Sequence, residues 1–352
     1  MPGAAILLTP AEGLSRLRAM STSIAHGRLV ELLERARGKR IAVIGDAMLD
    51  VYLSGDVDRV SPEAPVPVVR VRERRHALGG AANVAQNVVA VGATCDLVAA
   101  VGADRGAQIL RELLDELGGG STSLVTVDRS TTQKTRIVAR SQQLLRVDEE
   151  EDADLAGADM ARVLDAVRGA VADADAVVLE DYNKGVLVPP VIRAAIELAV
   201  ARKLPIIVDP KFKHFFEYRG ATVFKPNRRE LEAALGAAVD VDHPDAVPAT
   251  LQRLGVEHIL LTLGDRGMAL FSSDGEMARV PTVAREVYDV VGAGDTVTAY
   301  LAGMLAAGGT MLEAAIIANI AAGIEVSKLG AVSVTAAEVR DFVDHAAIPT
   351  VV

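Results

Sequence analysis

Pro205-Ile206-Ile207-Val208-Asp209-Pro210 is a short, largely β-branched run that ends in a carboxylate. Its apolar residues follow one another without alternation, which is typical of a strand buried on both faces of a parallel sheet. The same pattern recurs in both directions along the chain. We expect buried parallel strands at Ile41–Gly45, Leu97–Gly102, Ala176–Leu179, Pro205–Val208, Thr222–Phe224, Ile259–Leu263 and Met268–Phe271.

Helical patterns lie between these runs and predict the crossovers of a doubly wound sheet. They cover Ala81–Val91, Gln108–Leu117, Leu155–Val171 and Pro190–Ala201. No long linker rich in Pro, Gly or Ser divides the chain. We therefore expect an α/β fold with a single domain at residues 24–352, preceded by a disordered tail at residues 1–23.

Two stretches depart from this pattern, at about residues 51–72 and 123–148. The first contains Pro62, Pro65 and Pro67, and the second alternates polar and apolar residues over Thr131–Val138. Both are typical of antiparallel β-structure. Strands that interrupt a parallel core often cover a binding site, so we expect them to form a small β-sheet lid.

Composition narrows the kinds of partner. The 352 residues carry a net charge of -10, and only 3% of them are aromatic, which argues against a nucleic-acid-binding surface. No apolar run approaches the roughly 18 residues that span a bilayer. The one cysteine, Cys95, excludes an internal disulfide framework and suits a reducing cytoplasm. We expect a cytoplasmic protein that binds small molecules.

Polar residues follow several of the predicted strands. Because ligands of open α/β sheets bind outside the carboxyl ends of the strands, we expect these residues to share one site. Each taken alone is more often a helix cap. The strand ends are Gly45-Asp46, Gly102, Glu180-Asp181, Asp209-Pro210, Lys225-Pro226-Asn227 and Thr262-Leu263-Gly264.

Val291-Gly292-Ala293-Gly294-Asp295-Thr296 places small residues before a carboxylate at a predicted helix start. Glycines let several amides point at one spot, and a helix N-terminus favours an anion there. Asp295 could accept a proton from a hydroxyl that attacks a bound phosphoryl group. The alternative is an ordinary tight turn. The sequence has no Walker-type P-loop and no Gly-x-Gly-x-x-Gly after its first strand, so this late segment is the candidate phosphate site.

Four motifs occur in order over about Leu29–Phe342: Gly79-Gly80-Ala81-Ala82-Asn83, Lys225-Pro226-Asn227-x-x-Glu230, Thr262-Leu263-Gly264 and Asp289–Thr296. With them the chain resembles the ribokinase-like (PfkB-type) sugar kinases. The resemblance implies a three-layer α/β fold with a mostly parallel central sheet and a small β lid. The strands of such a lid would leave an open edge, which proteins commonly cover by pairing with another copy, so we expect a homodimer.

The resemblance implies a role for each motif in phosphoryl transfer from ATP to a sugar. Asp295 would be the general base, and the amides of Gly292, Ala293 and Gly294 would form an anion hole. Asn227 and Glu230 would position Mg²⁺ through water, although their i, i+3 spacing also fits a helix capping box. Further nucleotide-binding residues would be Lys225, Thr262, Gly264, Gly267, Asn319 and Gly323. Some relatives bind a monovalent cation beside the anion hole, and the sequence leaves this open.

Val60–Val68 and Thr135–Asp148 resemble the family members that phosphorylate D-glycero-β-D-manno-heptose 7-phosphate at its anomeric O1. Their product, the 1,7-bisphosphate, leads to ADP-heptose and the lipopolysaccharide core. Residues implied to contact the sugar are Asp46, Asp50, Gly79, Gly80, Asn83 and Asp181. The 7-phosphate needs cations, for which the candidates are Lys134, Arg136, Arg140 and Lys184.

Other readings stay open at this point. A kinase for another sugar or sugar phosphate, such as fructose 1-phosphate or ribose, would share these motifs. A catalytically inactive sensor of sugar or nucleotide would not need Asp295. Val291 stands where many relatives carry Thr, which removes one hydroxyl near the phosphate. The sequence contains no His-x-Gly-His of a nucleotidyltransferase, so we expect it only to phosphorylate.

Overall fold

The computed structural model describes residues 18–19, 24–140, 142–241, 247–284, 287–328, 330 and 332–345. The predicted tail at residues 1–23 lies outside this part of the chain, with one exception. Arg18–Ala19 form β1 and pair in parallel with β14 (Glu276–Val280). These two residues extend the sheet by one short strand.

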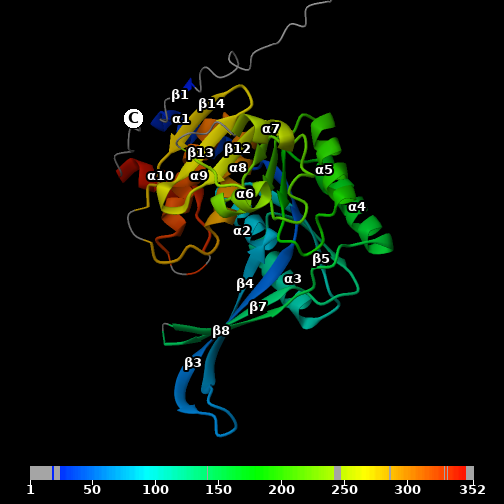
Figure 1. The fold of residues 1–352 in the computed structure, drawn as a ribbon, viewed down its shortest axis with the longest axis vertical. Coiled ribbons are helices and arrows are strands. Elements are labelled where there is room, and N and C mark those ends of the chain that lie inside the picture. The colour runs from blue at the N-terminus through cyan, green and yellow to red at the C-terminus, as the bar shows by residue number, and fades with distance from the viewer. Residues whose placement is uncertain are drawn as a thin grey trace, which may run out of the picture.

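A large sheet forms the centre of the molecule (Figure 1). Within the described residues it has ten strands in the order β1-β14-β13-β12-β11-β10-β9-β2-β5-β6. All seven strands expected from the apolar runs lie in it. Their bounds are β2 Arg40–Gly45, β5 Thr94–Val101, β9 Ala176–Glu180, β10 Ile206–Asp209, β11 Val223–Phe224, β12 His258–Thr262 and β13 Met268–Ser272.

The strands from β12 across to β6 (Gly120–Thr126) are parallel, so the expected mostly parallel sheet is confirmed. The expectation that Met268–Phe271 is also parallel is wrong, because β13 pairs with β12 in antiparallel orientation. The connection, Leu263–Gly267, is far shorter than the dozen or so residues of a parallel crossover. The carboxyl ends of β2, β9, β10 and β12 therefore meet at one edge.

Helices cover both faces of this sheet, which gives the expected three layers. One core includes residues of α1 (His26–Ala36), α2 (Ala81–Val91), α3 (Arg105–Leu117), α8 (Ala293–Ala306), α9 (Met311–Glu325) and α10 (Ala336–His345). The other includes residues of α4 (Gly157–Ala172), α5 (Pro189–Ala201), α6 (Arg228–Leu235) and α7 (Val247–Leu254). α8 and α9 are apolar around almost their whole circumference, as expected for helices buried on all sides.

A second sheet projects from the main body (Figure 1). Its order is β4-β3-β7-β8, with β3 Ala47–Val60, β4 Pro67–Gly80, β7 Gln133–Ala139 and β8 Gln142–Glu149. We call these four strands the lid. The lid begins at Ala47, a few residues before the predicted start at about residue 51. The predicted second lid segment, at about residues 123–148, includes the end of β6, but β6 pairs with β5 in the large sheet. A Ser- and Thr-rich edge strand resembles a lid strand in sequence, and only its pairing tells them apart.

Strand register in the lid decides which side chains share a face. β3 pairs with β7 in parallel, which places Asp50 opposite Lys134 and Tyr52 opposite Arg136. Since side chains alternate along a strand, these four residues lie on one face of the lid.

No helix in the described part of the chain combines the length and the apolar character needed to cross a membrane.

Candidate active site

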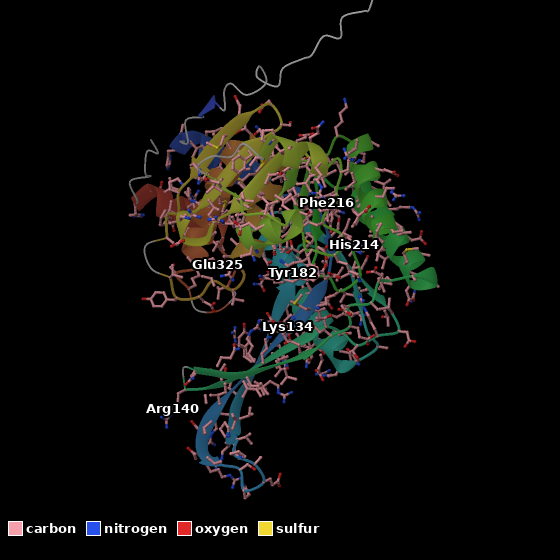
Figure 2. All side chains as sticks on the ribbon, in the orientation of Figure 1. Lys134, Arg140, Tyr182, His214, Phe216 and Glu325 are labelled. Atoms are coloured by element: carbon pink, nitrogen blue, oxygen red, sulfur yellow. The ribbon has the colours of Figure 1, made fainter. Side chains whose placement is uncertain are left out.

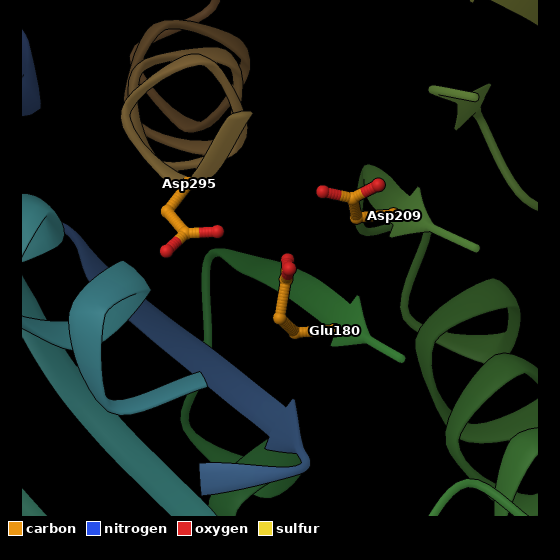
Figure 3. A group of neighbouring side chains, drawn as sticks. All are labelled: Glu180, Asp209 and Asp295. Atoms are coloured by element: carbon orange, nitrogen blue, oxygen red, sulfur yellow. The ribbon is translucent and has the colours of Figure 1, made fainter. Parts of the chain in front are cut away.

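Asp295 lies in the first turn of α8, directly above the carboxyl ends of β9 and β10 (Figure 3). Its side chain is buried. The side-chain amide of Asn83 donates a hydrogen bond to Oδ2 at 2.6 Å, and the Tyr182 hydroxyl donates to Oδ1 at 2.9 Å. The carboxylate is thus fixed from two sides, by α2 and by the loop that follows β9.

These surroundings set the basicity of Asp295. Burial raises its pKa to about 6, and the nearby Asp209 carboxylate adds to the rise. The hydrogen bonds from Asn83 and Tyr182 and the charge of Lys225 work in the opposite direction. The group is therefore ionised at neutral pH and is a stronger base than an exposed aspartate, as a general base should be.

The start of α8 forms a site suited to an anion. Gly292 caps the helix with a φ of 98°, a left-handed conformation that favours glycine. The first amides of an α-helix have no partner within the helix. A Cβ on Gly294 would lie 3.6 Å from Lys225 Nζ and 3.8 Å from Asp209 Oδ2. The Ala293 amide makes one long hydrogen bond, 3.5 Å to the carbonyl oxygen of Val290. A buried ammonium group therefore lies next to a helix N-terminus, an arrangement that favours a phosphoryl group.

Lys225 stays charged although it is buried. Burial lowers its pKa, but the carboxylates of Asp209 and Glu180 outweigh that effect and raise it above its ordinary value. Its Nζ donates to Asp209 Oδ2 at 2.8 Å. The resulting cation lies between the predicted anion hole and the end of β10.

A cavity of about 470 Å³ opens beside the start of α8. Ala293 and Gly294 line one part of it. Most residues that the family resemblance assigned to the nucleotide also line it, whereas Lys225 and Glu230 do not: the lining set includes Asn227, Thr262, Gly264, Gly267, Asn319 and Gly323. The structure therefore brings these residues, which are far apart in sequence, to one cavity.

Two of these residues shape the wall of the cavity. The Asn319 amide donates to the carbonyl oxygen of Pro281 at 2.7 Å, which ties α9 to the segment after β14. A Cβ on Gly323 would come within 2.6 Å of Val283 Cγ2. The absence of a side chain at Gly323 therefore lets that segment approach α9.

Asn227 and Glu230 form the capping box that their spacing allows. Asn227 Oδ1 accepts from the Glu230 amide at 2.9 Å, and Glu230 Oε2 accepts from the Asn227 amide at 2.8 Å. Lys211 Nζ donates to the other Glu230 oxygen at 2.5 Å. Carboxylate and amide oxygens suit Mg²⁺, so the residue types fit the ion. Since protein donors already occupy the Glu230 oxygens, contact through water agrees best with this geometry.

Close backbone packing explains the glycine pair before α2. Gly80 has a φ of 56°, and a Cβ there would lie 2.4 Å from the carbonyl oxygen of Asp46. A Cβ on Gly79 would lie 2.7 Å from Met48 Cγ and 3.1 Å from Asp50 Oδ2. Both positions therefore exclude a side chain.

Asp46 and Asp181, predicted to contact the sugar, are largely engaged by the protein. Asp46 accepts hydrogen bonds from the amides of Tyr182, Lys184 and Val186 at 2.8, 2.9 and 3.1 Å. Asp181 accepts from the amide of Asn183 at 2.7 Å and from a buried tyrosine hydroxyl at 2.8 Å. The two carboxylates therefore shape the loop after β9, which carries Tyr182 to Asp295.

The lid supplies cations on the face that carries Asp50. Arg136 donates to Asp50 Oδ1 at 2.7 Å. The ammonium groups of Lys134 and Lys184 both approach Glu150, at 2.8 and 3.0 Å. Lys134 and Lys184 come from different parts of the chain, so the structure gathers two of the predicted phosphate ligands around one carboxylate.

Arg140 is placed differently. It is exposed, has a φ of 58° and lies at the turn between β7 and β8. Figure 2 shows it at the outer end of the lid, away from Tyr182, whereas Lys134 lies between the two. The structure does not bring Arg140 together with the other predicted site residues.

Comparisons with known proteins agree with this geometry. Residues 39–337 match the family described as pfkB family carbohydrate kinase. The chain belongs to the pfkB family of carbohydrate kinases. Membership implies that ATP is the phosphoryl donor and that a sugar is the acceptor.

Similar curated proteins include the bifunctional protein HldE of Rhodospirillum rubrum, which is 46% identical over 88% of this chain and 63% of that protein. The protein of the same name from Caulobacter vibrioides is 46% identical over 91% of this chain and 65% of its own length. This chain therefore spans less than two thirds of either relative.

Solved structures of other sugar kinases share the fold. Arabidopsis thaliana ribokinase, complexed with ribose and ATP, matches 88% of this chain and all of its own with a TM-score of 0.69 and 20% identity. Phosphofructokinase-2 from Escherichia coli, in complex with potassium, matches 87% of this chain and 97% of its own with a TM-score of 0.73 and 17% identity. The ribokinase-like fold is thus confirmed.

Sequence reasoning did not assign a role to several residues of the site. Tyr182 contacts Asp295, Lys211 contacts Glu230, and Glu180 and Asp209 lie within 4.8 Å of Asp295, measured between carboxylate oxygens. The signal that could have found Glu180 and Asp209 is their position at strand ends, which was noted for both segments. Nothing in the sequence marks the contact between Tyr182 and Asp295.

Proposed function

We propose that this chain transfers the γ-phosphoryl group of ATP to the anomeric O1 of D-glycero-β-D-manno-heptose 7-phosphate. The product is the 1,7-bisphosphate, on the route to ADP-heptose and the lipopolysaccharide core. The observation that carries the proposal is the position of Asp295. Its fixed carboxylate follows Ala293 and Gly294, which line the nucleotide cavity, and it contacts Asn83 at the start of α2.

In this proposal each group acts where charge or a proton has to be handled. Asp295 accepts the proton of the anomeric hydroxyl as that oxygen attacks the phosphorus. The amides at the start of α8 and the Lys225 ammonium stabilise the charge on the transferring group. Asn227 and Glu230 would hold Mg²⁺ through water, and the bound ion would supply positive charge to the ATP phosphates. Asp50 and Asn83 hydrogen-bond the sugar hydroxyls, which penalises sugars that leave a buried polar group unpaired.

Two lysines support a phosphorylated substrate. Lys134 and Lys184 converge on the Glu150 carboxylate, so an anionic group already stabilises this pair. A phosphate carries more charge than a carboxylate and can replace Glu150 between the two ammonium groups. We assign the 7-phosphate to this position.

The relatives named bifunctional protein HldE support the choice of substrate together with the resemblance of Val60–Val68 and Thr135–Asp148 to heptose 7-phosphate kinases. The pfkB match covers most of this chain. In our proposal the chain carries out the kinase half of the two activities that the word bifunctional implies.

ATP consumption against a panel of sugars and sugar phosphates tests the proposal. We expect D-glycero-β-D-manno-heptose 7-phosphate to give the highest kcat/KM and to yield a product phosphorylated at C1. Ribose, fructose 1-phosphate and the unphosphorylated heptose are the comparison substrates. A higher kcat/KM for any of these three would contradict the assignment.

We further propose that residues 24–352 form one cytoplasmic kinase domain that dimerises through the lid. The edge strands β4 and β8 of the lid carry exposed apolar side chains, among them Val71 and Leu145. Unpaired strand edges with apolar side chains are commonly covered by a second copy. Light scattering on the wild type and on a Leu145→Glu variant tests the dimer.

Comparing the kinase activity in potassium and in tetramethylammonium salts tests whether the chain uses a monovalent cation.

A further inference from the structure

Glu180 is the last residue of β9, and its side chain is fully buried. Neither of its carboxylate oxygens has a hydrogen-bond partner among the residues that the structure describes. Figure 3 shows the side chain pointing into the space between Asp209 and Asp295. Oxygen atoms of the three carboxylates lie within 4.8 Å of one another. A buried, unpartnered acid is therefore directed into a cluster of like charges.

The neighbouring cations do not neutralise this cluster. Lys225 Nζ donates to Asp209 Oδ2 at 2.8 Å, and Lys211 Nζ donates to Glu230. Among the residues that the structure describes, neither ammonium group forms a hydrogen bond with Glu180. Burying an ionised carboxylate in such surroundings costs several kcal/mol of folding free energy unless the charge is paired. Burial and the carboxylates of Asp209 and Asp295 accordingly raise the pKa of Glu180 well above its ordinary value. The Glu180 carboxylate is therefore stabilised by binding either a proton or a cation.

A proton would satisfy this position only in part. A protonated carboxyl group has an O–H donor and an acceptor oxygen, and each would still be buried without a partner. A divalent cation removes both deficits, because it bonds the oxygens directly and offsets the charge of the cluster. Hard carboxylate oxygens are the ligands that Mg²⁺ and Mn²⁺ prefer.

We propose that Glu180 and Asp209 bind a divalent cation directly, at a position separate from the capping box of Asn227 and Glu230. Asp209 is suited to this because Lys225 engages its Oδ2 and a second oxygen is present. Asp295 already accepts from Asn83 and Tyr182, which leaves it to act as the base.

The site lies at the carboxyl edge of the sheet, beside Lys225 and the start of α8. A cation bound there adds positive charge where the phosphoryl group would pass. In that respect the inference rests on the proposed function, but binding of the ion does not. The ion belongs to the protein itself and is expected to bind without nucleotide.

Mn²⁺ binding to the whole chain tests the proposal without ATP, sugar or turnover. The signal of free Mn²⁺ in electron paramagnetic resonance gives the affinity directly. We expect the wild type to bind Mn²⁺, and Glu180→Gln to bind it at least tenfold more weakly. The matched control is Glu230→Gln, which makes the same chemical change at the capping box and should retain the affinity.

A second measurement covers the case in which Glu180→Gln perturbs folding. Mg²⁺ should raise the unfolding temperature of the wild type and of Glu230→Gln, but not that of Glu180→Gln or Asp209→Asn. Equal Mn²⁺ affinity in Glu180→Gln and the wild type would overturn the proposal, as would a wild type that binds no Mn²⁺ without nucleotide. Mn²⁺ binding by a chain that phosphorylates no sugar would support the ion site and count against the proposed function alone.

Discussion

Replacing Tyr182 with Phe tests whether the contacts of Asp295 tune its basicity. The variant removes one hydroxyl, which donates to Asp295 Oδ1 at 2.9 Å, and leaves the ring in place. A hydrogen bond donated to a carboxylate stabilises its charged form and lowers its pKa. In Tyr182→Phe the pKa of Asp295 should therefore rise above its present value of about 6.

The size of this rise follows from the strength of the bond. A hydrogen bond to a charged group contributes about 1.5–3 kcal/mol. Since one pKa unit corresponds to about 1.4 kcal/mol, the pKa should rise by about 1–2 units. At pH 7 the ionised fraction of Asp295 would then fall from about 90% to between about 50% and 10%. Activity that needs the carboxylate should fall by about two- to tenfold at pH 7 and recover at higher pH.

The assay is the pH profile of kcat/KM with ATP and the heptose 7-phosphate. We expect the acid limb, along which activity rises as Asp295 ionises, to move upward by about 1–2 pH units. A cation bound nearby lowers the pKa in both proteins, so the difference between their profiles is the quantity to compare. Tyr300→Phe is the matched control, because it also removes a hydroxyl from a 2.9 Å hydrogen bond, to Val334. Coincident acid limbs for Tyr182→Phe and the wild type would refute the reasoning.

Three further substitutions test the glycine pair, the phosphate site and the nucleotide cavity. Gly80→Ala should lower the free energy of unfolding, measured in urea, by about 1–3 kcal/mol because of the positive φ and the backbone contact at Gly80. The control Gly169→Ala, in open space on α4, should raise this free energy by about 0.5–1 kcal/mol. Equal stability of Gly80→Ala and the wild type would contradict the close packing at Gly80. Lys184→Ala should raise KM for the sugar phosphate by roughly ten- to a hundredfold but leave the unphosphorylated sugar unchanged, whereas Arg140→Ala should change neither; equal effects of Lys184→Ala on both sugars would remove Lys184 from the phosphate site. Gly323→Val should raise KM for ATP and spare KM for the sugar, since its side chain would collide with the cavity wall, and an unchanged KM for ATP would place the nucleotide elsewhere.

Local sequence patterns were enough to predict most of the central sheet and its crossover helices. The helix at Ala81–Val91 has the bounds that its pattern gave, because Gly80 and Gly92 limit it on both sides. The direction of β13 could not be read from its apolar residues, since the short connection after β12 decides it. The same holds for β6, whose Ser and Thr residues fit either sheet until its pairing is known.

The site was predictable where a motif carries the function in its backbone. The segment Gly292–Asp295 and the cavity-lining residues come together as the motif order suggested. Contacts between distant segments were not predictable, because one sequence does not show which side chains meet. Asp46 illustrates this limit, since three amides from the loop after β9 surround its carboxylate. Tyr182 illustrates the converse, a residue without a motif that contacts Asp295.

Turnover by Asp295→Asn tests the central claim most directly. The change keeps the size of the side chain and removes its ability to accept a proton. We expect kcat to fall by about 10²–10⁴-fold while calorimetry shows nearly unchanged affinities for ATP and the heptose 7-phosphate. A kcat within about threefold of the wild-type value would contradict the assignment of Asp295 as the general base.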